Sequence, residues 1–564
     1  MSDLWWEKTV IYQIYPRSFM DTTGSGTGDI AGIISKLDYL KELGIETIWL
    51  SPMYPSPTDK PYHLHDCGYD ISNYRDINTE YGDLEQFDQL VAEIHQRGLR
   101  IVMDLVLNHT SAEHPWFVES RSSRDNPKRD WYIWKDGRGK NGKKPPNNWT
   151  AMITGDAWKY DEHTQQFFYH EFLDFQPDLN YRNPEVQEEM LNTIRFWLNR
   201  GVDGFRLDII HALFEDEQCR DEPFAIPLPF TSKYGLIKKT ERQLHLPETI
   251  DFCKRIRETV DEFGGKFLVG EVHGPAEDQR KYFGDVANGK SDGLNLVFYF
   301  NSLNTLLNVK KVKSLIKTAE SSFADPLLPT WVFSNHDFPR RIFRLKNDIK
   351  KAKLNAALQL SLRGVPCIYY GEEIGMSNPT LDPKTSKDAL SHHLRLLPAV
   401  SRNLIRHFGL LLNRDEARTP MQWSSTENAG FSPPEGLPWL PVNDNFKRCN
   451  VEQQEKNPGS LLHCYKRFLK LRNNSPVLQS GALKIIEHPN FPSSVLAYER
   501  YLVDAPAKCL VLLNLSNRAE HFSVPYQNGE ILASTLSQSK VMVANKIALE
   551  AWEAVIIEVE GIAS

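Results

Sequence analysis

The sequence predicts an α/β fold: a (β/α)8 TIM barrel with a loop-rich domain inserted after its third strand and a C-terminal antiparallel β-sandwich domain. Strand-like apolar runs alternate with helix-patterned segments over most of the chain, which favours a parallel sheet with right-handed crossovers. Eight such strands can be counted, the number found in a closed barrel. The length of 564 residues suits a barrel with insertions and an accessory domain.

The first half of the barrel begins with a strand at 9–14. A helix at 30–43 follows, with apolar residues at helical spacing, and Gly44 ends it. The same order continues with a strand, a helix and a strand at 47–50, 84–96 and 100–105.

The alternation stops after His109. Residues 110–176 are rich in Pro, Gly, Trp and charged side chains, so they predict an inserted domain. Nine Lys or Arg residues against three Asp residues lie between Arg121 and Lys144, interleaved with tryptophan, which would also suit a nucleic-acid surface. A solvated loop is the better interpretation, because the whole chain carries a net charge of −7.

A helix at 185–199 resumes the alternation and leads to a strand that ends at Asp208. Long interruptions at 215–250 and 376–450 are expected to form loops on the barrel rim. The remaining four strands end at Val269, span 294–300, end at Phe333 and end at Tyr370.

The C-terminal part begins after a helix at 461–471, which Ser475-Pro476 breaks. Strand-like runs without helical crossovers then indicate an antiparallel sheet; they lie at 483–486, 495–501, 510–515 and 554–559. The expected limits are 1–109 and 177–478 for the two parts of the barrel, 110–176 for the inserted domain and 479–564 for the C-terminal β domain.

The amino-acid composition limits which kinds of molecule the protein is expected to bind. The chain has 66 Lys and Arg against 73 Asp and Glu, so it offers no field for nucleic acid or an anionic membrane, and we expect neither as a partner. No stretch approaches the ~18 apolar residues of a membrane helix, and no secretory signal is expected at the N-terminus. Seven scattered cysteines argue against a disulfide framework or a zinc site. We therefore expect a cytoplasmic protein that binds a small neutral molecule.

Polar, titratable residues follow the predicted strands, at the rim where barrel enzymes build their active sites. Arg206 and Asp208 would share one face of their strand, an arrangement that alone would also suit a structural ion pair. Six such residues lie at predicted strand ends, and a catalytic rim explains them better than a structural ion pair does. They are His109, Arg206, Asp208, Glu271, His336 and Asp337.

Three carboxylates, one arginine and two histidines, without a Gly-rich phosphate loop, indicate acid/base and nucleophilic chemistry on an uncharged, hydroxyl-rich substrate. Glycoside hydrolysis needs such a set, with one carboxylate as nucleophile and another as proton donor. We expect Arg206 to keep Asp208 ionised as the nucleophile, and neighbouring carboxylates to raise the pKa of Glu271, the acid/base.

At these residues the chain resembles the α-amylase family of glycoside hydrolases and, within it, the oligo-1,6-glucosidase and α-glucosidase group. The matching stretches run in family order over nearly the whole chain: 28–52, 104–109, 176–180, 204–208, 270–271, 333–337 and 364–371. The stretch Gln176-Pro-Asp-Leu-Asn180 is similar to the oligo-1,6-glucosidase group rather than to the endo-amylases.

The resemblance implies a retaining mechanism through a covalent glucosyl group on Asp208. It makes Asp337 the third catalytic carboxylate, which holds the 2- and 3-hydroxyls of the sugar. His109 and His336 would bind hydroxyls of the same glucose.

The closed end of the site is also implied by the resemblance. Asp66 and Tyr69 match the pocket floor and the stacking platform of the family, and Arg418 looks like the partner of Asp66, with Arg414 as the competing choice. A charged pair that grips the 4-hydroxyl admits only a non-reducing terminal glucose, so the enzyme would be exo-acting.

Two stretches depart from the family pattern. Asp21 and Asp29 remain in the place of a calcium loop, but Thr23 and Ser25 replace stronger ligands, so we expect no required cofactor and at most a weak Ca²⁺ site. After the nucleophile stands Ile209, a substrate-binding position where Val tends to accompany α-1,6 and Ala or Thr α-1,4 preference.

The expected activity is release of glucose from short α-glucosides such as maltose, isomaltose or sucrose. One alternative is a glucosyltransferase or sucrose isomerase, which would use the same double-displacement site. A remote alternative is a non-catalytic binding subunit like the transporter heavy chains that share this barrel, but those need a membrane segment.

Overall fold

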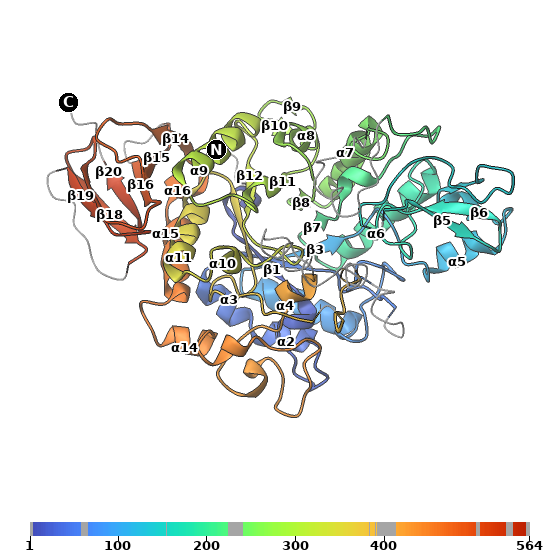
Figure 1. Ribbon diagram of the computed structural model, residues 1–564, viewed down its shortest axis with the longest axis horizontal. Coiled ribbons are helices and arrows are strands. Elements are labelled where there is room, and N and C mark those ends of the chain that lie inside the picture. The colour runs from blue at the N-terminus through green and yellow to red at the C-terminus, as the bar shows by residue number, and fades with distance from the viewer. Residues whose placement is uncertain are drawn as a thin grey trace.

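The computed structural model describes residues 4–57, 66–153, 155–223, 241–382, 384–389, 391, 413–503, 508–536 and 545–559. Within these ranges eight parallel strands form a closed barrel in the order β1-β13-β12-β11-β8-β7-β3-β2, which lies at the centre of Figure 1. Each corresponds to a predicted strand: β1 (Ile11–Ile14), β2 (Thr47–Leu50), β3 (Arg100–Leu105), β7 (Gly204–Leu207), β8 (Phe267–Gly270), β11 (Leu296–Tyr299), β12 (Pro329–Val332) and β13 (Val365–Tyr369).

The barrel strands are buried on both faces, as expected for parallel strands covered by helices. Apolar side chains such as Val102, Phe267 and Phe298 fill one cluster inside the barrel. The close approach of β7 to β8 requires a glycine, because a Cβ added at Gly204 would lie 2.3 Å from the carbonyl oxygen of Phe267. The sequence that carries Arg206 and Asp208 is therefore tightly fitted to its neighbouring strand.

Helices pack around the barrel, among them α4 (Leu84–Gln96), α6 (Pro184–Asn199), α7 (Pro247–Asp261), α9 (Val309–Ser322) and α11 (Ile349–Ser361). A capping box formed by Asp83 and Gln86 starts α4. The helix predicted at 30–43 is in fact two helices, α2 (Ile30–Ser35) and α3 (Leu37–Leu43). The two helices meet at Lys36, where the α-helical hydrogen-bond pattern is interrupted. The backbone N–H of Lys36 bonds to the carbonyl oxygens of Ile33 and Ile34.

The inserted segment after β3 contains more regular structure than predicted. It carries α5 (Pro115–Ser122) and a three-stranded antiparallel sheet of β4 (Trp134–Lys135), β6 (Gln166–Tyr169) and β5 (Trp158–Asp161), on the right of Figure 1. A backbone bridge between Tyr132 and Leu179 joins it to the barrel part, and one between His109 and Asp178 pairs the two chain segments that flank it. Aromatic side chains from the basic, Trp-rich stretch pack into the main hydrophobic core of the protein rather than forming an open surface: Trp131 is buried and Trp134 is half-buried.

The C-terminal domain is an antiparallel sandwich, as predicted. One sheet has five strands in the order β14-β15-β16-β20-β18, the other pairs β17 with β19, and their apolar faces share one cluster. The bounds are β14 (Ala482–Ile486), β15 (Val495–Tyr501), β16 (Lys508–Asn514), β17 (Glu520–Ser523), β18 (Gly529–Ser534), β19 (Lys546–Leu549) and β20 (Ala554–Val559).

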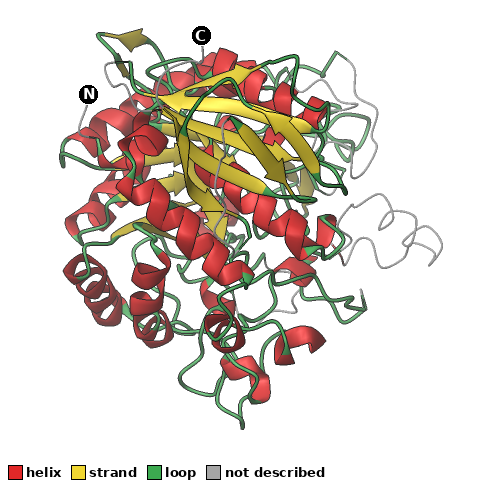
Figure 2. Cartoon of the chain, turned by 90° about the vertical axis from the view of Figure 1, so that its left-hand side faces the viewer, coloured by secondary structure: helices red, strands yellow, loops and turns green. Residues whose placement is uncertain are grey.

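A buried arginine joins this domain to the barrel: Arg500, on β15, donates to the carbonyl of Ser361 at 2.7 Å. A second buried arginine, Arg472 on α15 (Leu461–Asn474), donates to the carbonyl of Gly364 at 2.6 Å and so holds this last helix of the barrel part in place. Figure 2 looks onto the C-terminal sheet, with helices of the rest of the chain behind and below it.

Two global properties bear on the expectations above. All seven cysteines are free, and five of them are buried. No helix in the described part of the chain has the length and apolar character needed to span a bilayer.

Candidate active site

A pocket opens at the carboxyl ends of the barrel strands. Eight of the predicted site residues line it, namely Asp66, Tyr69, His109, Asp208, Ile209, Glu271, His336 and Asp337. Four further side chains complete the lining: Met152 and Phe172 from the inserted segment, His273, and Arg414. Arg206 and Arg418 do not line the pocket but bind carboxylates that do.

Arg206 lies beneath the pocket and binds three carboxylates. The parallel register sets Asp104 on β3 beside Arg206 on β7, and Nη1 donates to Asp104 Oδ1 at 2.7 Å. The same Nη1 donates to Asp208 Oδ1 at 2.6 Å, and Nη2 donates to Glu271 Oε2. Arg206 itself is only 1% exposed. Its guanidinium is the buried positive charge that balances the three carboxylates it binds.

The electrostatics of the two central carboxyls differ from the prediction. Burial, together with the charges of Glu271 and Asp104, raises the pKa of Asp208 well above its usual value despite Arg206. The pKa of Glu271 is lowered, although burial opposes this, because Arg206 and a hydrogen bond from His273 stabilise its anion. The expected order of the two pKa values is therefore reversed: Arg206 serves several acids, and Glu271 has an additional donor.

A hydrogen-bonded chain connects the pocket wall to Asp104. The side-chain amide of Gln13 donates to His336 Nδ1 at 2.9 Å, which leaves the ring proton on Nε2, facing Tyr69 Oη at 2.8 Å. Tyr69 in turn donates to Asp104 Oδ2 at 3.1 Å. The rings of Tyr69 and His336 are parallel within 5°, with centroids 5.3 Å apart. This chain holds His336 as a neutral donor, and burial lowers its pKa to about 3.

A second arginine, Arg414, binds the acids at another part of the pocket. It donates to Asp66 Oδ1 at 2.7 Å, Asp337 Oδ1 at 3.0 Å and Asp388 Oδ1 at 2.9 Å. The prediction that Arg418 pairs with Asp66 is wrong. Arg418 instead donates to Asp337 at 3.2 Å, because η7 (Arg414–Ala417) turns the chain and directs the two arginines to different acids.

The remaining predicted residues complete the wall. His109 is buried, its Nε2 lies 3.2 Å from the carbonyl oxygen of Tyr69, and its ring packs against Phe172 with centroids 5.5 Å apart. Ile209 has φ +32° and ψ +41°, a left-handed conformation that is strained for a β-branched residue. Held there, Ile209 lines the pocket directly beside Asp208.

A family model described as the catalytic domain of alpha amylase matches residues 13–481 of the chain. The chain belongs to the α-amylase family. Among its relatives are a probable alpha-glucosidase of Rhizobium meliloti (strain 1021), 39% identical over 98% of this chain and 96% of the relative, and an oligo-1,6-glucosidase of Parageobacillus thermoglucosidasius, 37% identical over 98% and 99%. Among solved structures, the trehalulose synthase of Pseudomonas mesoacidophila MX-45 has a TM-score of 0.87 at 32% identity, covering 99% of this chain and 100% of that one.

Three of the lining residues of this α-amylase family member were missed from the sequence. Met152 and Phe172 lie in the inserted segment, and no periodicity indicates which of its side chains return to the barrel. His273 stands two residues after Glu271, and its Nε2 lies 3.0 Å from Glu271 Oε1. An alternation of polar residues after β8, at Glu271 and His273, was the available signal.

Loop 21–29, for which at most a weak Ca²⁺ site was expected, directs its carboxylates at hydrogen-bond donors of the protein itself. Asp21 accepts hydrogen bonds on both oxygens, from Thr23 and Gly24 on one and from Gly26 and Ser432 on the other. Asp29 caps α2 by accepting from Gly32 at 2.6 Å, and its other oxygen accepts from Thr22 at 2.7 Å. These carboxylates are directed at N–H and O–H donors, so they stabilise a turn and a helix start. In the described residues no group of three or more His, Cys, Asp or Glu side chains could hold a metal.

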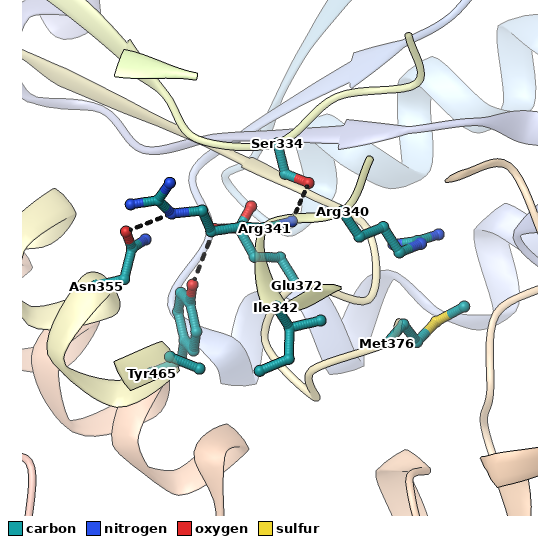
Figure 3. A pocket seen from close by; sticks show the side chains of 9 residues that line it. Ser334, Arg340, Arg341, Ile342, Asn355, Glu372, Met376 and Tyr465 are labelled. Carbon is teal, nitrogen blue, oxygen red and sulfur yellow. Dashed lines mark hydrogen bonds between the residues drawn. The ribbon is translucent and has the colours of Figure 1, made fainter. Parts of the chain in front are cut away.

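A second cavity lies apart from this pocket, between α10 (Arg341–Arg344), α11 and α15 (Figure 3). Arg341 crosses it, with Nε donating to Asn355 at 2.9 Å and its backbone N–H to Ser334 at 3.2 Å. Its volume of about 10 Å³ is the size of one water molecule. It is a packing space, and the substrate pocket is the one around Asp208.

Proposed function

We propose that this α-amylase family member is an exo-acting, retaining α-glucosidase that releases glucose from the non-reducing end of short α-glucosides. The observation that carries the proposal is the pairing of two clusters around one pocket. Arg206 joins Asp208 to Glu271, and Arg414 joins Asp66 to Asp337. The first cluster suits bond cleavage, and the second suits recognition of the hydroxyls of a terminal sugar.

In the first half of the reaction a carboxylate oxygen of Asp208 attacks the anomeric carbon. The bond from that carbon to the glycosidic oxygen breaks, and Glu271 donates its proton to that oxygen. In the second half a water molecule attacks the same carbon, its proton passes to the carboxylate of Glu271, and Asp208 leaves as a carboxylate. The configuration is inverted twice and so retained.

The pair needs one proton to begin this cycle. In the pocket without a sugar, burial raises the pKa of Asp208, and Arg206 and His273 lower that of Glu271, so the proton belongs to the coupled pair. Both carboxyls contact Arg206, and for cleavage the shared proton must pass to Glu271 while Asp208 becomes ionised. We propose that substrate binding drives this transfer.

The recognition roles follow the contacts. Asp66 and Arg414 would bind the 4-hydroxyl, Asp337 the 2- and 3-hydroxyls, and His336 would bind a hydroxyl of the same ring. Tyr69 provides the flat surface beside it. No step needs a cofactor, and the partner is a small neutral oligosaccharide or disaccharide. We also propose a cytoplasmic location, supported by the free cysteines.

The proposal is tested by supplying maltose, isomaltose, sucrose and trehalose to the purified protein and following the products by proton NMR. We expect glucose, released first as the α-anomer. Release of the β-anomer would contradict retention. From a maltooligosaccharide, early products other than glucose and the chain shortened by one glucose would contradict exo action.

A glucosyltransferase or sucrose isomerase is the second candidate. It is favoured by the structural likeness to the trehalulose synthase above and to the isomaltulose synthase of Erwinia rhapontici NX5, which has a TM-score of 0.85 at 31% identity. Product analysis on sucrose separates the two. Glucose and fructose support hydrolysis, whereas isomaltulose or trehalulose would support the isomerase.

A further inference from the structure

Glu271 is held at both of its carboxyl oxygens. Oε2 meets Arg206 Nη2, and Oε1 lies 3.0 Å from Nε2 of His273, which lines the same pocket. Asp208, in contrast, shares the guanidinium with Asp104. The second donor distinguishes Glu271 from its partner acid.

The ring of His273 is fixed from two sides. Its centroid lies 5.1 Å from that of Phe300 and 5.4 Å from that of His211, whose ring stands at 71° to it. His211 is fully buried, with Nδ1 3.3 Å from the backbone oxygen of Glu271, and it stacks on His245 at 5.0 Å. His245 Nδ1 lies 3.1 Å from Tyr282 Oη. This row of aromatic side chains limits how His273 can turn.

The two histidines behind His273 are themselves neutral. Burial lowers the pKa of His211 well below its usual value and that of His245 to about 4. The row therefore adds no positive charge to the pocket at neutral pH, and its contribution is to hold the His273 ring. The direct action on Glu271 comes from His273 itself, whose Nε2 lies 3.0 Å from Oε1.

A donor aimed at a carboxylate stabilises the ionised form over the protonated one. Glu271 needs the protonated form when it acts as an acid and the ionised form when it acts as a base. The His273 hydrogen bond therefore favours the second half of the reaction, in which Glu271 acts as a base, over the first half, in which it acts as an acid.

We propose that His273 is a positioning residue that holds Glu271 in the orientation and ionised form required for the second half of the double displacement. This inference rests on the proposed function. In that half a water oxygen bonds to the anomeric carbon, the bond from that carbon to Asp208 breaks with its electrons remaining on Asp208, and the water proton passes to Glu271.

Two matched variants test the hydrogen bond. His273→Gln keeps an N–H donor near the position of Nε2, and His273→Leu fills the space without a donor. With p-nitrophenyl α-glucoside the leaving group departs without an acid, so only the second half needs Glu271. We expect His273→Leu to lower kcat and KM together, each about tenfold, with kcat/KM unchanged within about twofold. His273→Gln should restore most of kcat.

Sodium azide provides a second readout, because it attacks the anomeric carbon without needing a base. It should raise the turnover of His273→Leu and yield glucosyl azide, with little effect on the wild type. A fall in kcat/KM at unchanged KM, or no rescue by either azide or His273→Gln, would overturn the proposal.

A titration that does not depend on turnover separates this inference from the proposed function. Infrared difference spectra, with Glu271→Gln to assign the band, give the pKa of the Glu271 carboxyl. We expect His273→Leu to raise it by about one unit, and an unchanged pKa would overturn the role of His273. A wild-type protein that does not cleave the glucoside would instead contradict the proposed function, and the titration would still decide the role of His273.

Discussion

Two buried arginines beside the pocket each bind three carboxylates, yet they come from different parts of the fold. Arg206 stands on a barrel strand and binds acids from two other strand ends, Asp104 and Glu271, besides its neighbour Asp208. Arg414 stands on η7 between strands and C-terminal helices, and binds Asp66, Asp337 and Asp388.

The difference lies in what holds each cluster. The first is positioned by strand register, which backbone hydrogen bonds and a packed barrel determine. The second is positioned by loops from three separate regions, so it depends on how these loops meet. We infer that the strand cluster carries the chemistry, which must be constant, and the loop cluster carries recognition.

The largest effect is expected for Asp208→Asn. An amide cannot form the glucosyl ester, so turnover should fall by at least about 10⁴-fold, on the scale of losses seen when a catalytic nucleophile is removed. Initial rates measure this, with circular dichroism as the control for an intact fold. Residual activity within a factor of ten of the wild type would exclude Asp208 as the nucleophile.

Removing the centre of the strand cluster should affect stability as well. Arg206→Met leaves buried acids without a counter-charge, so we expect a loss of about 3–5 kcal/mol in the free energy of unfolding at pH 8. The folded-state pKa values of these acids rise in the variant, so the stability they contribute is present at low pH and lost as pH rises. Denaturant melts at pH 5 and pH 8 should show a smaller loss at pH 5. An equal loss at both pH values would contradict this electrostatic account.

The loop cluster should respond mainly in substrate binding. Arg414→Lys replaces a planar fork by a single ammonium group that cannot hold Asp66 and Asp337 together. We expect kcat/KM to fall about 10- to 100-fold, mostly through KM. Arg418→Lys is the matched control, since Arg418 contacts Asp337 but not Asp66, and its loss should be less than about fivefold. Equal losses would mean that Asp66 does not recognise the sugar.

The smallest effect is expected at Ile209, which lines the pocket next to Asp208. Ile209→Val removes one methylene from the wall beside Asp208, and we expect it to change the ratio of isomaltose to maltose cleavage by about three- to tenfold. Parallel assays of the two disaccharides measure this. An unchanged ratio would show that linkage preference is set by another part of the wall.

Much of this protein could be predicted from its sequence. Periodicity and turn residues predicted the eight barrel strands and the C-terminal sheet, because buried strands and amphipathic helices have distinct repeats. Polar residues at strand ends predicted Asp208, Glu271 and Asp337 as neighbours, since parallel strands of a barrel end on one rim. The domain limits and the individual roles of these residues stay predictions.

Tertiary structure alone decided the rest. Arg414 rather than Arg418 binds Asp66, and Met152 and Phe172 return to the pocket. Each is a contact between loops or across an insertion, where no repeat relates sequence distance to spatial distance. The pKa order of Asp208 and Glu271 also depends on how one buried guanidinium is shared, which distances and burial determine. Short-range sequence patterns thus specified the barrel and the polar residues on its rim. Long-range packing determined which side chains contact each other in the pocket.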